Sequence, residues 1–222
     1  LIDDAIEAGL NKGADQLVIL GAGYDTRGMR IPGAGEVPVF ELDQPVTPER
    51  KKRRPGKSLS SLPSNITYVP FDLEDEGVGA PLARGGFLSG KVTVCVWEGV
   101  VSYLSEEAVD ATLRWFASQN APGSRLVFTY IDLSGFGSVS GAEEGLPWKN
   151  VLAKAGEPFR FGLETAVVPA FLAERGLRLT WDVSTAEALA GRYPGRDLGS
   201  PPEFYRVALA EIPTATADAA GG

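Results

Sequence analysis

Short apolar runs and amphipathic stretches alternate along the chain. Seven runs rich in branched aliphatic and aromatic residues predict strands, and three stretches with apolar residues at helical spacing predict helices. The run at 92–97 is apolar at nearly every position, which is typical of a parallel strand covered on both faces. The other predicted strands are 16–20, 37–42, 66–70, 125–130, 177–183 and 204–211, and the predicted helices are 1–13, 105–119 and 167–175.

Signals at the ends of these segments support an α/β fold. Ser105 is predicted to cap the N-terminus of the second helix, and Gly176 is predicted to end the third. Alternating strands and helices indicate a mostly parallel sheet, with one domain over residues 1–212. The Gly- and Ser-rich region 132–158 is expected to be irregular, apart from a helix at 147–155, and 213–222 to be a disordered tail.

The composition excludes several kinds of catalytic and metal-binding site. The 222 residues have a formal net charge of −8, no histidine and one cysteine, Cys95. A Ser-His-Asp triad, a histidine zinc site, a thiolate cluster and an internal disulfide are therefore excluded within this chain, and we expect no metal. The acidic balance argues against nucleic acid as a partner. No apolar run approaches the roughly 18 residues of a membrane span, and no signal segment is visible, so we expect a cytoplasmic location.

The carboxyl ends of the first two strands carry the first candidate site residues, because ligands of parallel α/β sheets bind at that edge. Gly21-Ala22-Gly23 follows the first strand and permits a sharp turn and a close ligand approach. Thr26 stands where the dinucleotide fingerprint needs a third glycine. Asp43, twenty residues beyond Gly23 at the end of the second strand, is placed to accept bonds from ribose hydroxyls, and Glu41 alternates onto the same side.

The next two strand ends also finish in acidic residues. Asp72 follows the third strand and could accept a bond from an exocyclic amino group, with Leu73 beside the ring. Glu98 closes the apolar fourth strand and needs a partner, since an unpaired buried charge is costly. An ammonium or hydroxyl group of a ligand would serve, and so would a structural bond to a nearby backbone amide.

This set of strand ends resembles the class I S-adenosylmethionine (SAM)-dependent methyltransferases. More narrowly, it resembles the leucine carboxyl methyltransferase family, including its bacterial polyketide-type O-methyltransferases. The resemblance extends over about residues 2–209 and implies a Rossmann-like, doubly wound, mostly parallel seven-stranded sheet with helices on both faces. Family members have a helical segment before this stretch, so the domain is expected to be truncated at its N-terminus. The motifs that carry the resemblance are Val18–Arg27, Phe40–Pro45, Asp72–Leu73 and Glu98–Leu104.

The resemblance also implies a cofactor and roles for these residues. The cofactor would be SAM, with Gly21, Ala22 and Gly23 in the turn beside its methionine moiety. Asp43 would hold the ribose with Glu41 in support, Asp72 and Leu73 would contact the adenine, and Glu98 would lie near the sulfonium and amino end.

The implied reaction is methyl transfer to a carboxylate or hydroxyl oxygen of a small molecule or a terminal carboxylate. An ionised carboxylate acceptor needs no base, whereas a hydroxyl needs one, and the sequence identifies none. Two alternatives stay open: an NAD-dependent oxidoreductase of Rossmann type, and an inactive SAM-fold binding protein. The oligomeric state is open as well.

Three further features have ordinary explanations. The basic cluster at 50–57 is interpreted as a solvated helix start rather than a nucleic-acid patch. Cys95 lies within an apolar strand and is expected to be a core residue rather than a nucleophile. Trp148, Phe159 and Phe161 either line an acceptor pocket or pack in the core.

Overall fold

The computed structural model describes residues 1–44, 63–73, 76–134, 159–197, 199 and 201–214. The predicted helix at 147–155, Trp148, the basic cluster at 50–57 and most of the predicted tail lie outside these ranges.

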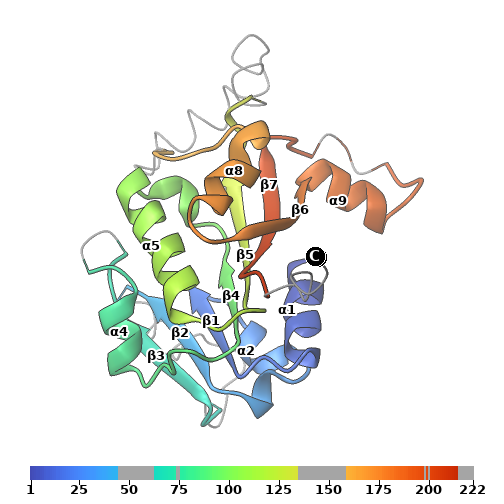
Figure 1. Cartoon of the computed structure of the whole chain (residues 1–222). Coiled ribbons are helices and arrows are strands. Elements are labelled where there is room, and N and C mark those ends of the chain that lie inside the picture. Colours follow the sequence, from blue (N-terminus) through green and yellow to red (C-terminus); the bar gives the residue numbers. More distant parts are fainter. Residues whose placement is uncertain (45–62, 74–75, 135–158, 198, 200, 215–222) are drawn as a thin grey trace, which may run out of the picture.

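The described residues form one seven-stranded sheet in the order β3-β2-β1-β4-β5-β7-β6 (Figure 1). The five strands β1 to β5 run parallel to one another, and β7 pairs antiparallel with both β5 and β6. The Rossmann-like, mostly parallel seven-stranded sheet is therefore confirmed, with one antiparallel strand inserted between β5 and β6. The strands are β1 Gln16–Leu20, β2 Val39–Asp43, β3 Ile66–Pro70, β4 Thr93–Trp97, β5 Arg125–Ile131, β6 Arg178–Ser184 and β7 Tyr205–Glu211.

Helices cover both faces of the sheet because consecutive strand residues point to opposite sides. Val18 and Leu20 pack into one apolar cluster with α4, α5 and α8, while Leu17 and Ile19 pack into a second cluster with α1. Figure 1 shows α5 and α1 on opposite sides of the central strands. The helices are α1 Ile2–Asn11, α2 Arg27–Arg30, α4 Gly79–Arg84, α5 Glu106–Gln119, α8 Val168–Ala173 and α9 Thr185–Arg192.

The predicted helix ends are close to those observed. The Ser105 hydroxyl accepts the Ala108 N–H at 3.2 Å, which confirms the N-cap of α5. Gly176 has a φ of +80° and follows α8, although the helix ends at Ala173, before the predicted limit. Helices α2, α4 and α9 were not predicted from the sequence. The N-terminus of α9 has a capping box in which Ser184 and Glu187 bond each other's backbone N–H groups.

Parallel pairing brings the carboxyl ends of the first five strands to one edge. The carboxyl end of β6 and the amino end of β7 reach the same edge, since β7 runs opposite to both of its neighbours. Seven of the eight predicted site residues follow or end strands at this edge, and Glu41 lies within β2. The fold therefore collects side chains that are far apart in the sequence.

Candidate functional site

The turn after β1 is tightly enclosed. Gly21 has a φ of +66° and Gly23 a φ of +46°, which is the left-handed region that favours glycine. A Cβ on Gly21 would lie 2.3 Å from Cγ2 of Val100, so the segment after β4 packs directly on the turn. On the other side, the Ala22 N–H donates to the Leu42 carbonyl of β2 at 2.9 Å. The glycines thus allow both a turn and a contact that a side chain would prevent.

Asp43 joins this turn from the end of β2. Its Oδ2 accepts the Gly23 N–H, and its Oδ1 accepts the Gln44 N–H at 2.6 Å. The twenty-residue spacing therefore does bring Asp43 to the glycine turn. This carboxylate holds the turn through backbone bonds in the structure, and its role toward a ribose stays a prediction.

Glu41 lies deeper than Asp43 on the same strand. Its side chain is buried, with Oε1 only 3.3 Å from where a Cβ on Gly28 of α2 would stand. Burial, with the Glu41 charge second, raises the pKa of Tyr68 to about 12. Glu41 therefore lies beneath α2, so it could support ribose binding by Asp43 only from the interior of the protein.

The end of β3 is fixed to the end of β2. The Phe71 N–H donates to the Asp43 carbonyl at 2.9 Å. Asp72 is half-buried, and its carbonyl accepts the Glu76 N–H at 3.1 Å. The Leu73 side chain is buried in the apolar core with Phe71 and other neighbours. Asp72 and Leu73 follow β3 as the sequence predicts, and their contact with an adenine stays a prediction.

Glu98, at the end of β4, is paired with Arg27. One Glu98 oxygen, Oε2, accepts a bond from Arg27 Nη1 at 2.5 Å. Arg27 also donates to Asp25 Oδ2 at 2.8 Å and, through Nε, to Asp3 Oδ1 of α1 at 2.7 Å. Burial opposes the charge of Arg27, but the bond to Asp3 and the charges of Asp25 and Glu98 raise its pKa. Glu98 is exposed, so the expectation of a buried carboxylate that requires a partner is wrong, although the carboxylate is paired with the mostly buried Arg27.

Arg27 is a site residue that was not identified from the sequence. It belongs to the predicted motif Val18–Arg27, where its positive charge among acidic strand ends is the available signal. Its side chain is 15% exposed and Glu98 is 41% exposed, so the pair runs from the interior to the surface.

A cavity of about 400 Å³ opens at this edge of the sheet, between β1 and β4. Four predicted residues line it: Gly21, Ala22, Gly23 and Glu98. The other four, Glu41, Asp43, Asp72 and Leu73, are not among its lining residues in the described part of the chain. Glycine backbone, carboxylates and guanidinium groups together can bind a ligand that bears both positive and negative charges. The full lining is Ile19, Leu20, Gly21, Ala22, Gly23, Tyr24, Asp25, Thr26, Arg27, Arg30, Val96 and Glu98.

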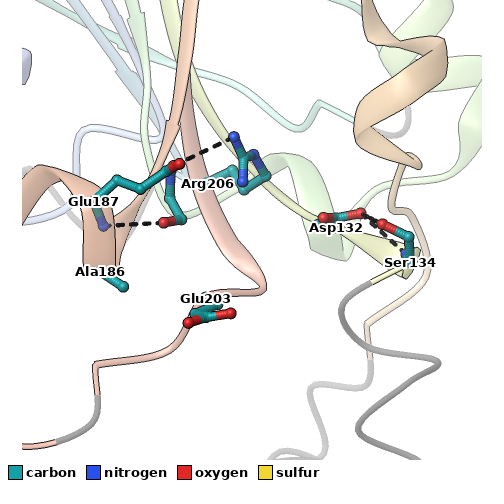
Figure 2. A pocket seen from close by; sticks show the side chains of 7 residues that line it. Asp132, Ser134, Ala186, Glu187, Glu203 and Arg206 are labelled. Carbon is teal, nitrogen blue, oxygen red and sulfur yellow. Dashed lines mark hydrogen bonds and ion pairs between the residues drawn. The ribbon is translucent and has the colours of Figure 1, made fainter.

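A second cavity of about 420 Å³ lies at the same edge, beside the ends of β5 and β6 (Figure 2). Arg206 projects from β7 and pairs with Asp182 at 2.9 Å and with Glu187 at 3.6 Å. Across from it, Asp132 accepts bonds from Ser134, from the hydroxyl at 2.6 Å and from the backbone N–H at 3.0 Å. None of the predicted site residues lines this cavity.

Two aromatic candidates and the cysteine have structural contacts. Phe161 is buried in the core, and Phe159 packs against Tyr103 with ring centroids 5.6 Å apart. Cys95 is 1% exposed, and burial raises the pKa of its thiol, which confirms it as a core residue. Phe161 is thus a packing residue, while the role of Phe159 toward an acceptor stays a prediction.

Sequence comparison connects this geometry to known proteins. The profile of leucine carboxyl methyltransferases matches residues 1–117. The chain belongs to the leucine carboxyl methyltransferase family. A relative from Mycolicibacterium paratuberculosis is 31% identical over 91% of this chain and 68% of its own length. One from Mycobacterium sp. (strain JLS) is 31% identical over 84% of this chain and 62% of its own length. Both are provisionally named S-adenosyl-L-methionine-dependent methyltransferases, and this chain spans about two thirds of their length.

Solved structures agree on the fold. A protein from Thermobifida fusca, provisionally described as a methyltransferase, matches with a TM-score of 0.66 at 16% identity. The match covers 96% of this chain and 79% of that one.

Among the residues described here, no helix has the length and apolar character needed to cross a membrane.

Proposed function

We propose that this chain carries out SAM-dependent methyl transfer to an oxygen atom, either a carboxylate or a hydroxyl, of a small-molecule acceptor. The observation that supports this most directly is the glycine turn after β1, with Asp43 bonded to Gly23 on one side and Glu98 beside the cavity on the other. Membership of the leucine carboxyl methyltransferase family favours methyl transfer over the nicotinamide-dependent alternative. Thr26, in place of the third glycine, points the same way.

The residues present fit this cofactor. SAM carries a positive sulfonium, an ammonium and a carboxylate, together with ribose hydroxyls that donate hydrogen bonds. The cavity offers the carboxylate of Glu98 and the guanidinium of Arg27, and the unsubstituted glycine turn lets a ligand approach the backbone. Gly21, Ala22, Gly23 and Glu98 would hold the methionine end, Asp43 the ribose with Glu41 behind it, and Asp72 and Leu73 the adenine.

The chain's own contribution is to position the reactants. When bound, SAM supplies an electrophilic methyl group attached to a sulfonium. Residues at the strand ends then orient the acceptor oxygen and keep bulk water away, which lowers the entropic cost of bringing two reactants together. No histidine is available in this chain as a general base. This favours an acceptor that is already ionised at neutral pH, and a carboxylate meets that condition.

Calorimetric titration tests cofactor choice. S-adenosylhomocysteine, the demethylated product, should bind the wild-type chain, whereas NAD should not. Asp43→Ala should weaken binding by about 1–3 kcal/mol if Asp43 accepts ribose hydroxyls. Asp110→Ala, a change on the far helix α5, is the control and should leave affinity unchanged. Binding of NAD instead of S-adenosylhomocysteine would overturn the proposal, and unchanged affinity in a folded Asp43→Ala protein would remove the ribose role.

Methyl transfer itself needs a second measurement. Labelled SAM should transfer its methyl group to at least one member of a panel of carboxylic and phenolic acceptors. Label in a base-labile ester indicates a carboxylate acceptor, and label in a base-stable ether indicates a hydroxyl acceptor. Cofactor binding with no transfer to any acceptor would favour the alternative of an inactive binding protein.

A further inference from the structure

The backbone of the segment Glu98–Val100 is held by residues outside the cofactor motifs. The Gly99 N–H donates to the Thr129 hydroxyl of β5 at 2.8 Å. That hydroxyl lies 3.1 Å from the hydroxyl of Tyr205, the first residue of β7. The two bonds form a relay from the antiparallel strand, across β5, to the carboxyl end of β4.

The groups of the relay lie where few other hydrogen-bond partners are available. Thr129 is 2% exposed, so its hydroxyl depends on these two neighbours for hydrogen bonds. Gly99 has a φ of +71°, and a Cβ at that position would lie 4.0 Å from the Tyr205 hydroxyl. Tyr205 therefore lies directly beside the residue that follows Glu98. Burial raises the pKa of Tyr205, and the nearby Glu98 charge acts in the same direction, so the phenol stays protonated at neutral pH.

The segment is also held from the opposite side. Val100 packs on Gly21 so closely that no side chain fits at that glycine. Both anchors lie directly after Glu98, at Gly99 and Val100, and the Glu98 carboxylate is bonded to Arg27. Because these anchors fix the backbone immediately after Glu98, they help to determine where its carboxylate lies relative to the cavity.

We propose that Thr129 and Tyr205 are positioning residues of the cofactor site, which act through the Gly99 N–H to fix the carboxylate of Glu98. This inference rests on the proposed function, because it assumes that Glu98 contacts the bound cofactor. It assigns the amino end of β7 a part in cofactor binding, although neither Thr129 nor Tyr205 lines the cavity.

Isosteric substitutions test the relay. Thr129→Val removes the hydroxyl and keeps the shape, Thr129→Ser restores the hydroxyl, and Tyr205→Phe removes only the phenol oxygen. Thr129→Val should speed exchange of the Gly99 amide proton, followed by NMR in the ligand-free protein, by about 10-fold or more. It should also weaken S-adenosylhomocysteine binding by about 3- to 10-fold, the range set by one ordinary hydrogen bond. Tyr205→Phe should give a smaller change in the same direction, and Thr129→Ser should restore both readouts.

Controls separate positioning from general stability. Thr112→Val removes another buried threonine hydroxyl, which bonds a carbonyl within α5 at 2.8 Å, and should leave affinity and Gly99 exchange unchanged. In a Glu98→Gln background, Thr129→Val should cost little further affinity, because the two changes disturb one interaction.

The outcomes distinguish this inference from the proposed function. If the wild-type chain does not bind S-adenosylhomocysteine, the proposed function fails and this inference fails with it. If the wild type binds and Thr129→Val binds equally well despite faster Gly99 exchange, only the positioning role is overturned. Equal losses from Thr112→Val and Thr129→Val would also overturn it, since the effect would then be one of stability.

Discussion

Replacing Arg27 by methionine should destabilise the fold far more than the same change at Arg30. Both arginines lie in α2 and both bond the carboxylate of Asp3. Arg27 also bonds Asp25 and Glu98, and its side chain is 15% exposed against 48% for Arg30. The two variants therefore lose the same type of residue from the same short helix but differ in burial and in the number of acidic partners.

The magnitude follows from those partners. Arg27→Met leaves three carboxylates clustered without their shared cation, and removing one member of a buried pair typically costs about 3–5 kcal/mol. Asp3 and Glu98 are 38% and 41% exposed, so water offsets part of this loss, and we expect about 2–3 kcal/mol. Arg30→Met removes one exposed pair and should cost about 0.5 kcal/mol. Methionine keeps most of the apolar stem, so lost packing contributes little to either value.

Equilibrium unfolding in urea measures both variants against the wild type. The Arg27→Met midpoint should fall clearly, with an unchanged dependence of the free energy on urea concentration, and the Arg30→Met midpoint should stay close to that of the wild type. High salt should reduce the difference only slightly, because the Arg27 pairs are partly buried. Equal losses of stability in the two variants would show that the buried network adds nothing beyond a surface ion pair, and would refute this reasoning.

Three further predictions concern stability and access. Gly21→Ala should cost about 2–3 kcal/mol in urea unfolding because of its φ of +66° and its clash with Val100, whereas Gly86→Ala, at φ +89° in open space, should cost only about 1 kcal/mol. Bonds to its arginine partners lower the Asp3 pKa from 3.8 to about 2, against the opposing effect of burial. The stabilisation from the Asp3 carboxylate is therefore present above about pH 4 and is lost as the pH falls toward 2. Over this pH range, the free energy of unfolding of Asp3→Asn should fall by about 1 kcal/mol less than that of the wild type. Iodoacetamide should label Cys95 only in urea-unfolded protein, and labelling of the native chain would contradict its burial.

The strands were predictable from the sequence because their local pattern and their burial agree. The residues of β1 and β4 are buried without exception, so an unbroken apolar run is a reliable signal for them. The antiparallel direction of β7 was not predictable in the same way. Its direction depends on contacts with β5 and β6, and an apolar run contains no information about the direction of the neighbouring strands. Helix α9 was missed because it contains no buried residue in the structure, which leaves its capping box as the main local signal.

For the candidate site too, the residues could be predicted from the local sequence, whereas their contacts with distant residues could not. Gly21, Asp43 and Glu98 were identifiable because each ends a strand, and strand ends meet at one edge of a parallel sheet. Arg27 and Glu98 are 71 residues apart, and their pairing depends on how α2 lies against β4. Spacing along the chain therefore predicts which residues reach the edge, but the partners of each charge are set by the packing of helices on the sheet.

The Arg27 pair bears directly on what Glu98 can bind. Arg27 bonds Oε2, and among the described residues no hydrogen bond reaches Oε1. A carboxylate held through one oxygen keeps a fixed direction while its other oxygen remains able to accept a ligand donor. Because Arg27 is itself held by Asp3 and Asp25, it has little freedom to follow Glu98 if the backbone at Gly99 shifts. Under the proposed relay, the direction of the Glu98 carboxylate is set jointly by α1, by the glycine turn and by β7. A change at any of these positions should therefore alter the affinity for the cofactor that we propose Glu98 to contact.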